Sequence, residues 1–390
     1  MLTNGKKWVL CIAIVIFALT GCGKGKASRE TENDSGSLEN RNADISAELV
    51  FRQRMDLQYA KEFTVDCYQD GYTLLSVTDG GRYLVVPEGK TAPEDLEEGI
   101  TVLQQPLDHI YLVASAAMDM VCELGSEDAI RFSGQKADGW CIEKAEEEMQ
   151  KGNILYAGKY NMPDYELIVS EGCSLAIENN MISHSPEVIE KLESFGIPVC
   201  IDRSSYEEHP LGRVEWIKFY GVLFGKEEEA DRLFGEQTAI LNRIAADEPS
   251  DKTVAFFYIT SNGMINVRRS SDYVPKMIEL AGGKYIFDDL DSEESNRSTL
   301  TMQAEQFYYG AKEADYLVYN STVDGEIRTV DELLAKENTL KDFKAVKEGN
   351  VWCTTRDLYQ QSMSLGAMME DFHNMLLGEE KDMRFLYPLE

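Results

Sequence analysis

The chain has 390 residues, with 38 lysines and arginines against 69 aspartates and glutamates, so its formal net charge is −31. An excess of negative charge this large argues against nucleic acid and anionic lipid as binding partners, because both repel carboxylates. Apolar residues make up 43% of the chain, which is ordinary for a globular protein, and the length allows two domains.

The first residues have the pattern of a secretory signal. Lys6 and Lys7 precede an apolar run, residues 8–19, that is shorter than the ~20 residues a membrane-spanning helix needs. The run ends at Leu19-Thr20-Gly21-Cys22, which is similar to the bacterial lipobox. We therefore expect residues 1–21 to be a lipoprotein signal peptide and Cys22 to carry lipid. The protein is then expected at the cell membrane, lipid-anchored on the extracytoplasmic face, rather than held by a transmembrane helix.

Residues 22–47 are rich in small and polar side chains and predict a flexible linker. Six cysteines follow in the body of the chain: Cys67, Cys122, Cys141, Cys173, Cys200 and Cys353. None of them has the Cys-x-x-Cys spacing of a zinc or redox motif. We expect mostly buried free thiols rather than a disulfide framework.

Residues 48–212 are interpreted as an N-terminal α/β lobe. Apolar runs at 63–65, 73–77 and 83–86, with a turn at Asp79-Gly80-Gly81, predict a β-meander. A βα series is then predicted, because helical patterns separate short apolar runs. The expected strands of this series are 110–114, 154–157, 175–177 and 197–201.

Residues 213–250 are predicted to be bridging helices, 213–224 and 226–244, with a break at Gly225. The second helix is long enough to span roughly 30 Å at 1.5 Å per residue, so ligand binding is expected to move the lobes little. A second βα series has strands at 254–258, 316–319 and 351–353, and it defines a C-terminal α/β lobe, 251–390. The predicted fold class is α/β: two α/β lobes with mainly parallel sheets, joined by one long helix, plus an N-terminal β-meander.

Several segments carry a resemblance to a known family. They include Gly158 with the following Pro163-Asp164-Tyr165-Glu166-Leu167-Ile168, and the segments 176–187, 204–218, 273–284 and 304–307. Together with the lipobox and the bridging helix, the chain resembles the substrate-binding lipoproteins of ABC importers for iron–siderophore, haem and cobalamin. The resemblance implies a receptor without catalytic residues or cofactor that delivers an iron complex or a related macrocycle to an ABC permease.

The resemblance also implies a docking role for two glutamates. Glu166 and Glu305 each lie early in a predicted helix, one in each lobe, where the family places the carboxylates that contact arginines of the permease dimer. The alternative is that each acid only favours the dipole of its helix. We expect a monomeric binding protein that docks on this dimer.

The ligand is expected between the lobes, at the carboxyl ends of the strands. Arginine suits anionic siderophores or propionates, and aromatic rings suit a macrocycle. Trp140 is a further candidate for the mouth of the cleft. The candidate ligand-binding residues are Tyr160, Glu178, Asn179, Arg203, Tyr206, Arg268, Arg269, Asn320, Arg356 and Tyr359.

Two other functions remain open from the sequence. The first is a receptor that binds a transition metal directly, but the four histidines are dispersed and no metal site is predicted; a capping or core role is the interpretation for His209. The second is a surface hydrolase, but no Gly-x-Ser-x-Gly, His-Glu-x-x-His or P-loop motif is present.

Overall fold

The computed structural model describes residues 44–245, 247–290, 298–379 and 382–390. Cys22, the signal peptide 1–21 and most of the linker 22–47 lie outside the described residues. Within the part that the structure describes, no helix is long and apolar enough to cross a membrane.

The N-terminal sheet has five strands, in the order β1-β2-β3-β4-β5. These are β1 (Phe51–Arg54), β2 (Phe63–Tyr68), β3 (Thr73–Val77), β4 (Arg82–Val86) and β5 (Ile100–Gln104). Pairing is antiparallel up to β4 and parallel between β4 and β5. Alternate residues point to opposite faces, so Val65 and Leu75 join the main hydrophobic core while Leu74 and Leu84 join a smaller one. The predicted meander is confirmed and gains a strand at each edge.

The first α/β lobe is built on a fully parallel sheet in the order β12-β11-β6-β7-β8. Its strands are β6 (Ile110–Leu112), β7 (Ile130–Ser133), β8 (Leu155–Tyr156), β11 (Leu175–Asn179) and β12 (Val199–Asp202). Between them lie α1 (Ser115–Glu123), α2 (Glu143–Gln150), α3 (Tyr165–Ser170), α4 (Pro186–Ser194) and a small hairpin of β9 (Gly158–Lys159) and β10 (Met162–Pro163). Strand β7 was not predicted from the sequence.

The second α/β lobe has a sheet in the order β16-β14-β13-β17-β18-β19, with β15 also paired to β13. Its strands are β13 (Thr253–Ile259), β14 (Ile265–Arg268), β15 (Lys284–Tyr285), β16 (Thr299–Met302), β17 (Tyr316–Tyr319), β18 (Val351–Thr354) and β19 (Leu386–Pro388). Its helices are α8 (Tyr273–Leu280), α9 (Ala304–Ala311), α10 (Val330–Lys336), α11 (Lys344–Glu348) and α12 (Leu365–Leu377). The central pairs are parallel and the outer pairs are antiparallel.

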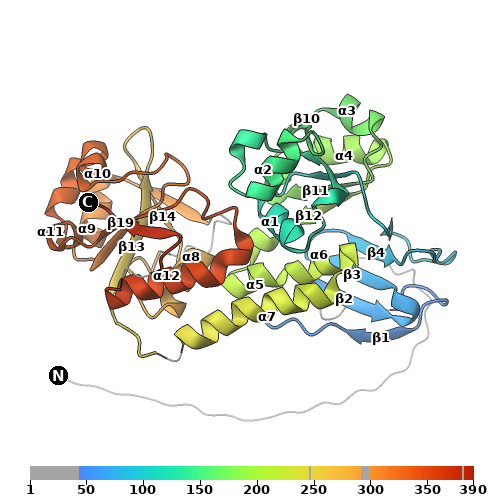
Figure 1. Ribbon diagram of the computed structural model, residues 1–390, viewed down its shortest axis with the longest axis horizontal. Coiled ribbons are helices and arrows are strands. Elements are labelled where there is room, and N and C mark those ends of the chain that lie inside the picture. The colour runs from blue at the N-terminus through green and yellow to red at the C-terminus, as the bar shows by residue number, and fades with distance from the viewer. Residues whose placement is uncertain (1–43, 246, 291–297, 380–381) are drawn as a thin grey trace, which may run out of the picture. The chain divides into compact units, whose positions relative to one another are not determined.

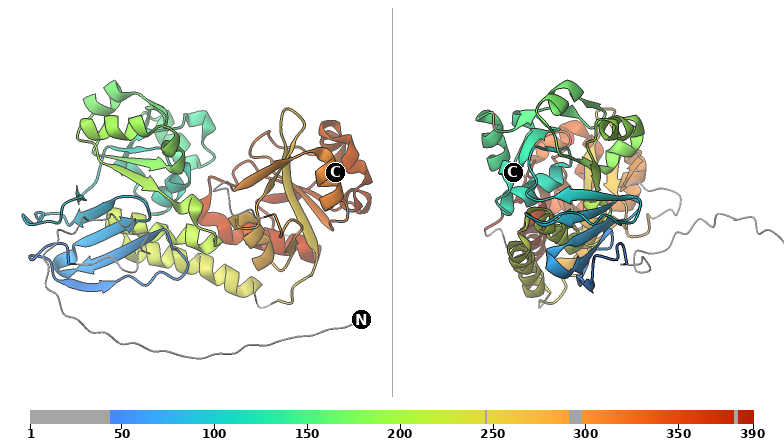
Figure 2. Two further views of the ribbon diagram at one scale, coloured as in Figure 1. Left: turned by 180° about the vertical axis from the view of Figure 1, so that it is seen from behind. Right: turned by 90° about the vertical axis from the view of Figure 1, so that its right-hand side faces the viewer.

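Three helices connect the two lobes: α5 (Pro210–Glu215), α6 (Ile217–Phe224) and α7 (Glu227–Ile244). Gly225 adopts a left-handed conformation with φ 63° and ends α6, as the sequence predicted. The first predicted helix is divided at Trp216 into α5 and α6. Helix α7 packs against α6 and α12 and runs from beside the N-terminal sheet to the second lobe (Figures 1 and 2).

Candidate ligand-binding cleft

A hollow of about 570 Å³ lies at the carboxyl ends of the first lobe's strands. Its lining residues follow β6, β7, β8 and β11, and include Val113, Gln135, Lys136, Tyr156, Tyr160 and Asn179. The Asn179 side chain is fixed, because its oxygen accepts from the Met181 N–H at 2.9 Å and its amide group donates to the Val113 carbonyl at 3.4 Å. The structure therefore places two candidate residues, Tyr160 and Asn179, in the lining of this hollow.

Three candidate residues of the second lobe meet at one point. The Tyr359 hydroxyl accepts from the Arg268 guanidinium and from Asn320 Nδ2 at 2.9 Å. The guanidinium carbon of Arg268 also lies 4.8 Å from the centroid of the Tyr359 ring. Asp272, at the start of α8, pairs with Arg268 at 3.4 Å. Burial raises the pKa of Tyr359, so its phenol is neutral. The positive charge of Arg268 is already partly neutralised by Asp272.

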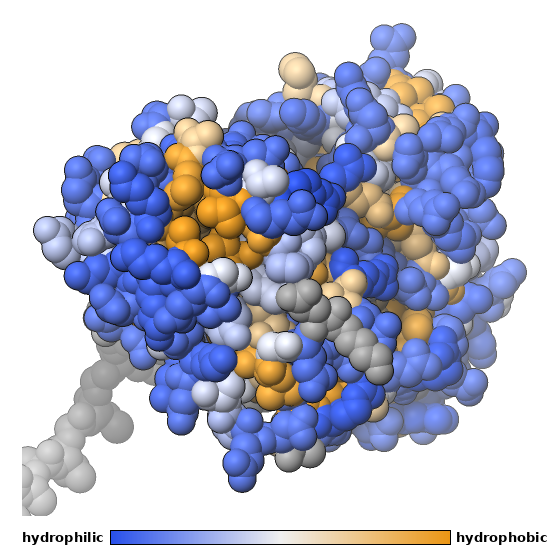
Figure 3. All heavy atoms as spheres, turned by 60° about the vertical axis from the view of Figure 1, so that its left-hand side comes forward, coloured by the Kyte–Doolittle hydropathy of each residue, from blue (hydrophilic) through white to orange (hydrophobic). Residues whose placement is uncertain are grey.

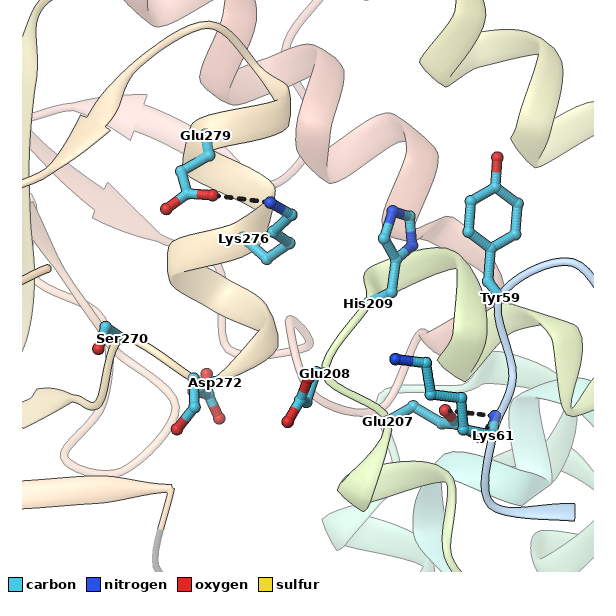
Figure 4. A pocket seen from close by; sticks show the side chains of 10 residues that line it. Tyr59, Lys61, Glu207, Glu208, His209, Ser270, Asp272, Lys276 and Glu279 are labelled. Carbon is cyan, nitrogen blue, oxygen red and sulfur yellow. Dashed lines mark hydrogen bonds and ion pairs between the residues drawn. The ribbon is translucent and has the colours of Figure 1, made fainter. Parts of the chain in front are cut away.

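A pocket of about 350 Å³ lies between the two halves of the molecule (Figure 4). We call it the interlobe pocket. One wall carries Tyr59, Lys61, Glu207, Glu208 and His209. The other wall carries Ser270, Ser271, Asp272, Lys276 and Glu279, which lie around the start of α8 and along its first two turns. Lys276 and Glu279 pair across 2.9 Å.

His209, in the first of these walls, has a neutral imidazole ring. Its Nδ1 accepts from the Leu211 backbone N–H at 3.1 Å and so caps α5. Burial, with the nearby Lys276 and Lys61 cations, lowers the pKa of His209. A neutral imidazole with an accepting Nδ1 carries its proton on Nε2, so Nε2 is not free to bind a metal. The capping role interpreted from the sequence is confirmed.

Hydrogen bonds also join the lobes beside α1. Gln360 accepts from the Cys141 N–H at 2.8 Å and donates to the Gly139 carbonyl at 2.9 Å. The Asp119 carboxylate accepts from the Met363 N–H at 2.7 Å, and burial raises the pKa of Asp119 to about 7. These contacts link the first lobe to the segment that precedes α12.

Glu178 and Trp140 lie away from both pockets. Glu178 is 0% exposed, because it points to the opposite face of β11 from Asn179. Among the described residues, neither of its carboxyl oxygens has a hydrogen-bond partner, and burial raises its pKa to about 8. Trp140, expected at the mouth of the cleft, is instead part of the hydrophobic core and only 2% exposed. Its size and apolar surface favour burial.

Arg203, Tyr206, Arg269 and Arg356 are not in the second-lobe cluster. Arg203 pairs with Glu62 at 2.7 Å and lies over the Tyr206 ring, with 4.3 Å between the guanidinium carbon and the ring centroid. This pair lies beside the N-terminal sheet and lines neither the hollow nor the interlobe pocket. Arg269 is buried next to the residues of the interlobe pocket, and Arg356 is exposed.

Glu166 and Glu305 are both exposed in the first turns of α3 and α9, one in each lobe. Among the described residues neither forms an ion pair. Each therefore has a carboxylate that is free to contact a partner, and each also has the position that favours a helix dipole.

Sequence reasoning missed Tyr59, Lys61, Glu208 and the residues at the start of α8 that face them. Tyr59 and Lys61 lie between predicted elements, and no local pattern assigns them a role. In the described ranges, no three His, Cys, Asp or Glu side chains are grouped so that they could hold a metal ion.

Comparisons with known proteins agree with this architecture. The family model described as periplasmic binding protein matches residues 113–358. An uncharacterised lipoprotein of Methanocaldococcus jannaschii is 25% identical over 398 residues, which cover 96% of this chain and 97% of the relative.

Solved structures with the same fold have low sequence identity. The periplasmic haem-binding protein HutB of Vibrio cholerae aligns with a TM-score of 0.56 at 16% identity, over 67% of this chain and 97% of that chain. An ABC-type Fe³⁺-hydroxamate transport system protein of Saccharomonospora viridis aligns with a TM-score of 0.53 at 16% identity, over 69% of this chain and 93% of that chain. At this level of identity the likeness concerns the fold.

Proposed function

Because the chain belongs to the periplasmic binding protein family, whose members bind substrates rather than act as enzymes, we propose that it delivers an iron complex to an ABC permease. The ligand class we propose is a siderophore, haem or a related macrocycle such as cobalamin. The structural neighbours named for haem and for Fe³⁺-hydroxamate support this class.

The observation that carries the proposal is the interlobe pocket. Two walls from different halves of the chain face one another across it, and each presents polar groups on rigid elements (Figure 4). Such a convergent concave site is typical of small-molecule binding. The Arg268–Tyr359–Asn320 cluster lies next to it through the contact of Arg268 with Asp272.

Direct binding of a transition metal is the second candidate, and the chemistry of His209 disfavours it. A metal-binding histidine usually donates its second ring N–H to a carbonyl or carboxylate. The Nδ1 of His209 instead accepts a backbone N–H. We therefore propose that any metal enters as part of a complex.

We propose that Cys22 anchors the protein by lipid and that Glu166 and Glu305 dock on the permease dimer. The lipobox and the lipoprotein name of a relative support the anchor. The exposure of one carboxylate on each lobe supports docking on two equivalent arginine-bearing surfaces.

The test combines binding with uptake. Purified protein is titrated with haemin, ferrichrome and cyanocobalamin, and with Zn²⁺ and Mn²⁺, while cells that carry the permease are assayed for uptake of the labelled probe that binds. The variant with both Glu166→Ala and Glu305→Ala should keep its affinity within about twofold and lose uptake, because an exposed docking residue does not touch the ligand.

Each single variant should retain partial uptake, since one lobe keeps its contact. Glu190→Ala on α4, an exposed acid of the first lobe, is the matched control and should transport normally. Normal uptake by the double variant would remove both residues from docking. If the protein binds Zn²⁺ or Mn²⁺ tightly and binds none of haemin, ferrichrome and cyanocobalamin, the proposed ligand class is wrong.

A further inference from the structure

A short segment between β1 and β2 is held in an unusual way. Residues 58–62, which we call the strap, direct five consecutive backbone N–H groups at two buried carboxylates. Gln58, Tyr59 and Ala60 donate to Glu215 at 2.8–2.9 Å. Lys61 and Glu62 donate to Glu207 at 2.9–3.0 Å.

The two carboxylates are themselves fixed. Glu215 is 0% exposed and also accepts from Lys218 Nζ at 3.1 Å, and Glu207 is 3% exposed and accepts from the Trp216 indole at 3.0 Å. Hydrogen bonds to a charged acceptor are stronger than neutral ones. The backbone of the strap is therefore a rigid part of the molecule and not a loose connection.

The strap places two side chains in the interlobe pocket. The Tyr59 ring stacks on His209, with ring centroids 4.4 Å apart and planes at 25°, so its orientation is determined. Lys61 is exposed, and Figure 4 shows its ammonium group directed into the open space of the pocket, toward the side of Glu208 and away from Tyr59.

The strap lies outside the residues that match the family model, 113–358, whereas the other pocket residues lie inside them. Glu207 and Glu215, which hold the strap, belong to the matched region. The part of this wall that Tyr59 and Lys61 form therefore lies outside the matched region, and acids of the matched region hold it in place.

Charge pairing in the pocket leaves Lys61 available. Lys276 pairs with Glu279 at 2.9 Å, and Asp272 accepts from the Val274 N–H at 3.0 Å and from Arg268 at 3.4 Å. Among the described residues of the pocket, the charged side chains of Lys61 and Glu208 form no ion pair. The pocket can therefore offer an ammonium to an anion and a carboxylate to a hydroxyl or amide donor.

We propose that the strap determines ligand specificity: Lys61 pairs with an acidic group of the ligand, and Tyr59, stacked on His209, holds that imidazole as the flat surface against which the ligand packs. The inference rests on the proposed function and narrows its ligand to complexes that carry a carboxylate or another anionic group together with hydrogen-bond donors. Lys61 and Tyr59 are specificity residues and not metal ligands.

The test measures affinity for probes of different charge. Haemin and ferric citrate carry carboxylates, whereas ferrichrome and cyanocobalamin do not. Lys61→Gln should weaken binding of a carboxylate probe at least about tenfold, and less at high salt, because a charge-assisted pair is lost and salt screens such pairs. It should change the affinity for ferrichrome, which carries no anionic side group, by less than about twofold. Tyr59→Ala should weaken both kinds of probe.

Gln58→Ala is the matched control, since it lies on the strap, keeps its backbone N–H and has a side chain outside the pocket lining. It should bind like the unmodified protein. Circular dichroism of each variant checks that the fold is intact. If the unmodified protein binds a probe and Lys61→Gln and Tyr59→Ala bind it equally well, the inference is overturned while the proposed function stands. If the unmodified protein binds none of the four probes, both are overturned.

Discussion

At the scale of single residues, Glu178 has the most unusual environment. It occupies a position on β11 that the sequence associates with the ligand, yet its carboxyl group lies in the interior and has no hydrogen-bond partner in the part of the chain that the structure describes. Burial raises its pKa from the usual 4.5 to about 8, so the group stays protonated in the folded protein at neutral pH. A buried carboxylate without a partner would be costly, and protonation avoids that cost.

The raised pKa of Glu178 predicts a pH dependence of stability. Between pH 4.5 and about 8 the unfolded chain loses this proton while the folded chain keeps it, so the free energy of unfolding falls as the pH rises through that window. The stabilising contribution of Glu178 is greatest below pH 4.5 and is lost by about pH 8. The shift in pKa corresponds to a change of roughly 3–5 kcal/mol in the free energy of unfolding.

Glu178→Gln should remove this dependence, because glutamine has a similar shape and does not ionise. We expect the variant to be about 2–4 kcal/mol more stable than the unmodified protein at pH 8 and similar to it near pH 5. Urea unfolding at both pH values measures the difference, with Glu190→Gln as an exposed control. Equal pH slopes for the unmodified protein and Glu178→Gln would show that Glu178 titrates normally.

At the scale of elements, the strap and α5 depend on one another. The Glu215 carboxylate at the end of α5 replaces the hydrogen-bond partners that a strand or helix would give to residues 58–60. Buried backbone N–H groups need partners, so this single side chain allows an irregular segment to pass through a buried region.

Glu215→Gln should therefore be strongly destabilising in spite of its similar shape. The amide NH₂ of the new glutamine would face backbone N–H groups, which are also donors, so a hydrogen bond would be lost. We expect a loss of about 2–4 kcal/mol in the free energy of unfolding. Urea denaturation followed by tryptophan fluorescence measures it, because Trp216 is the next residue. Glu190→Gln again serves as the control and should change stability by less than about 0.5 kcal/mol. A loss as small as that of the control would mean that water replaces the carboxylate.

At the scale of the whole molecule, one face of the surface is largely hydrophilic. Figure 3 shows a face covered mostly by hydrophilic side chains, with hydrophobic side chains in separate patches. A net charge of −31 is expected to favour solubility and to disfavour nucleic acid and anionic lipid as partners.

The connections between the lobes predict a small response to ligand. Helix α7 packs against helices on both sides, and Gln360 bonds to Gly139 and Cys141 across the lobes. We expect the radius of gyration to change by less than about 1 Å when haemin or ferrichrome binds, since helices α5, α6 and α7 connect the lobes in the part of the chain that the structure describes. Small-angle X-ray scattering with and without the bound probe tests this.

Gln360→Ala removes both of those hydrogen bonds and should make the ligand-dependent change larger. Gln58→Ala, on the strap, should leave it as in the unmodified protein. A decrease of several ångströms in the unmodified protein would indicate domain closure and contradict a rigid connection.

The sequence by itself determined the elements whose signals are local. Short apolar runs predicted strands such as β3, β17 and β18, and Gly225 predicted the end of α6, because an apolar run and a left-handed cap can each be recognised within a few residues. Glu166 and Glu305 could be placed at the starts of helices for the same reason.

Only the tertiary structure decided which surfaces meet. Strand β7 is four residues long with Arg131 in it, so it exists because its neighbours pair with it and not because its pattern is strong. The strap depends on acids about 150 positions away in the chain, and Glu178 lies on a strand that pairs with β6 and β12 on its two sides. Contacts between residues so far apart depend on how the elements pack, and a local sequence pattern cannot predict them.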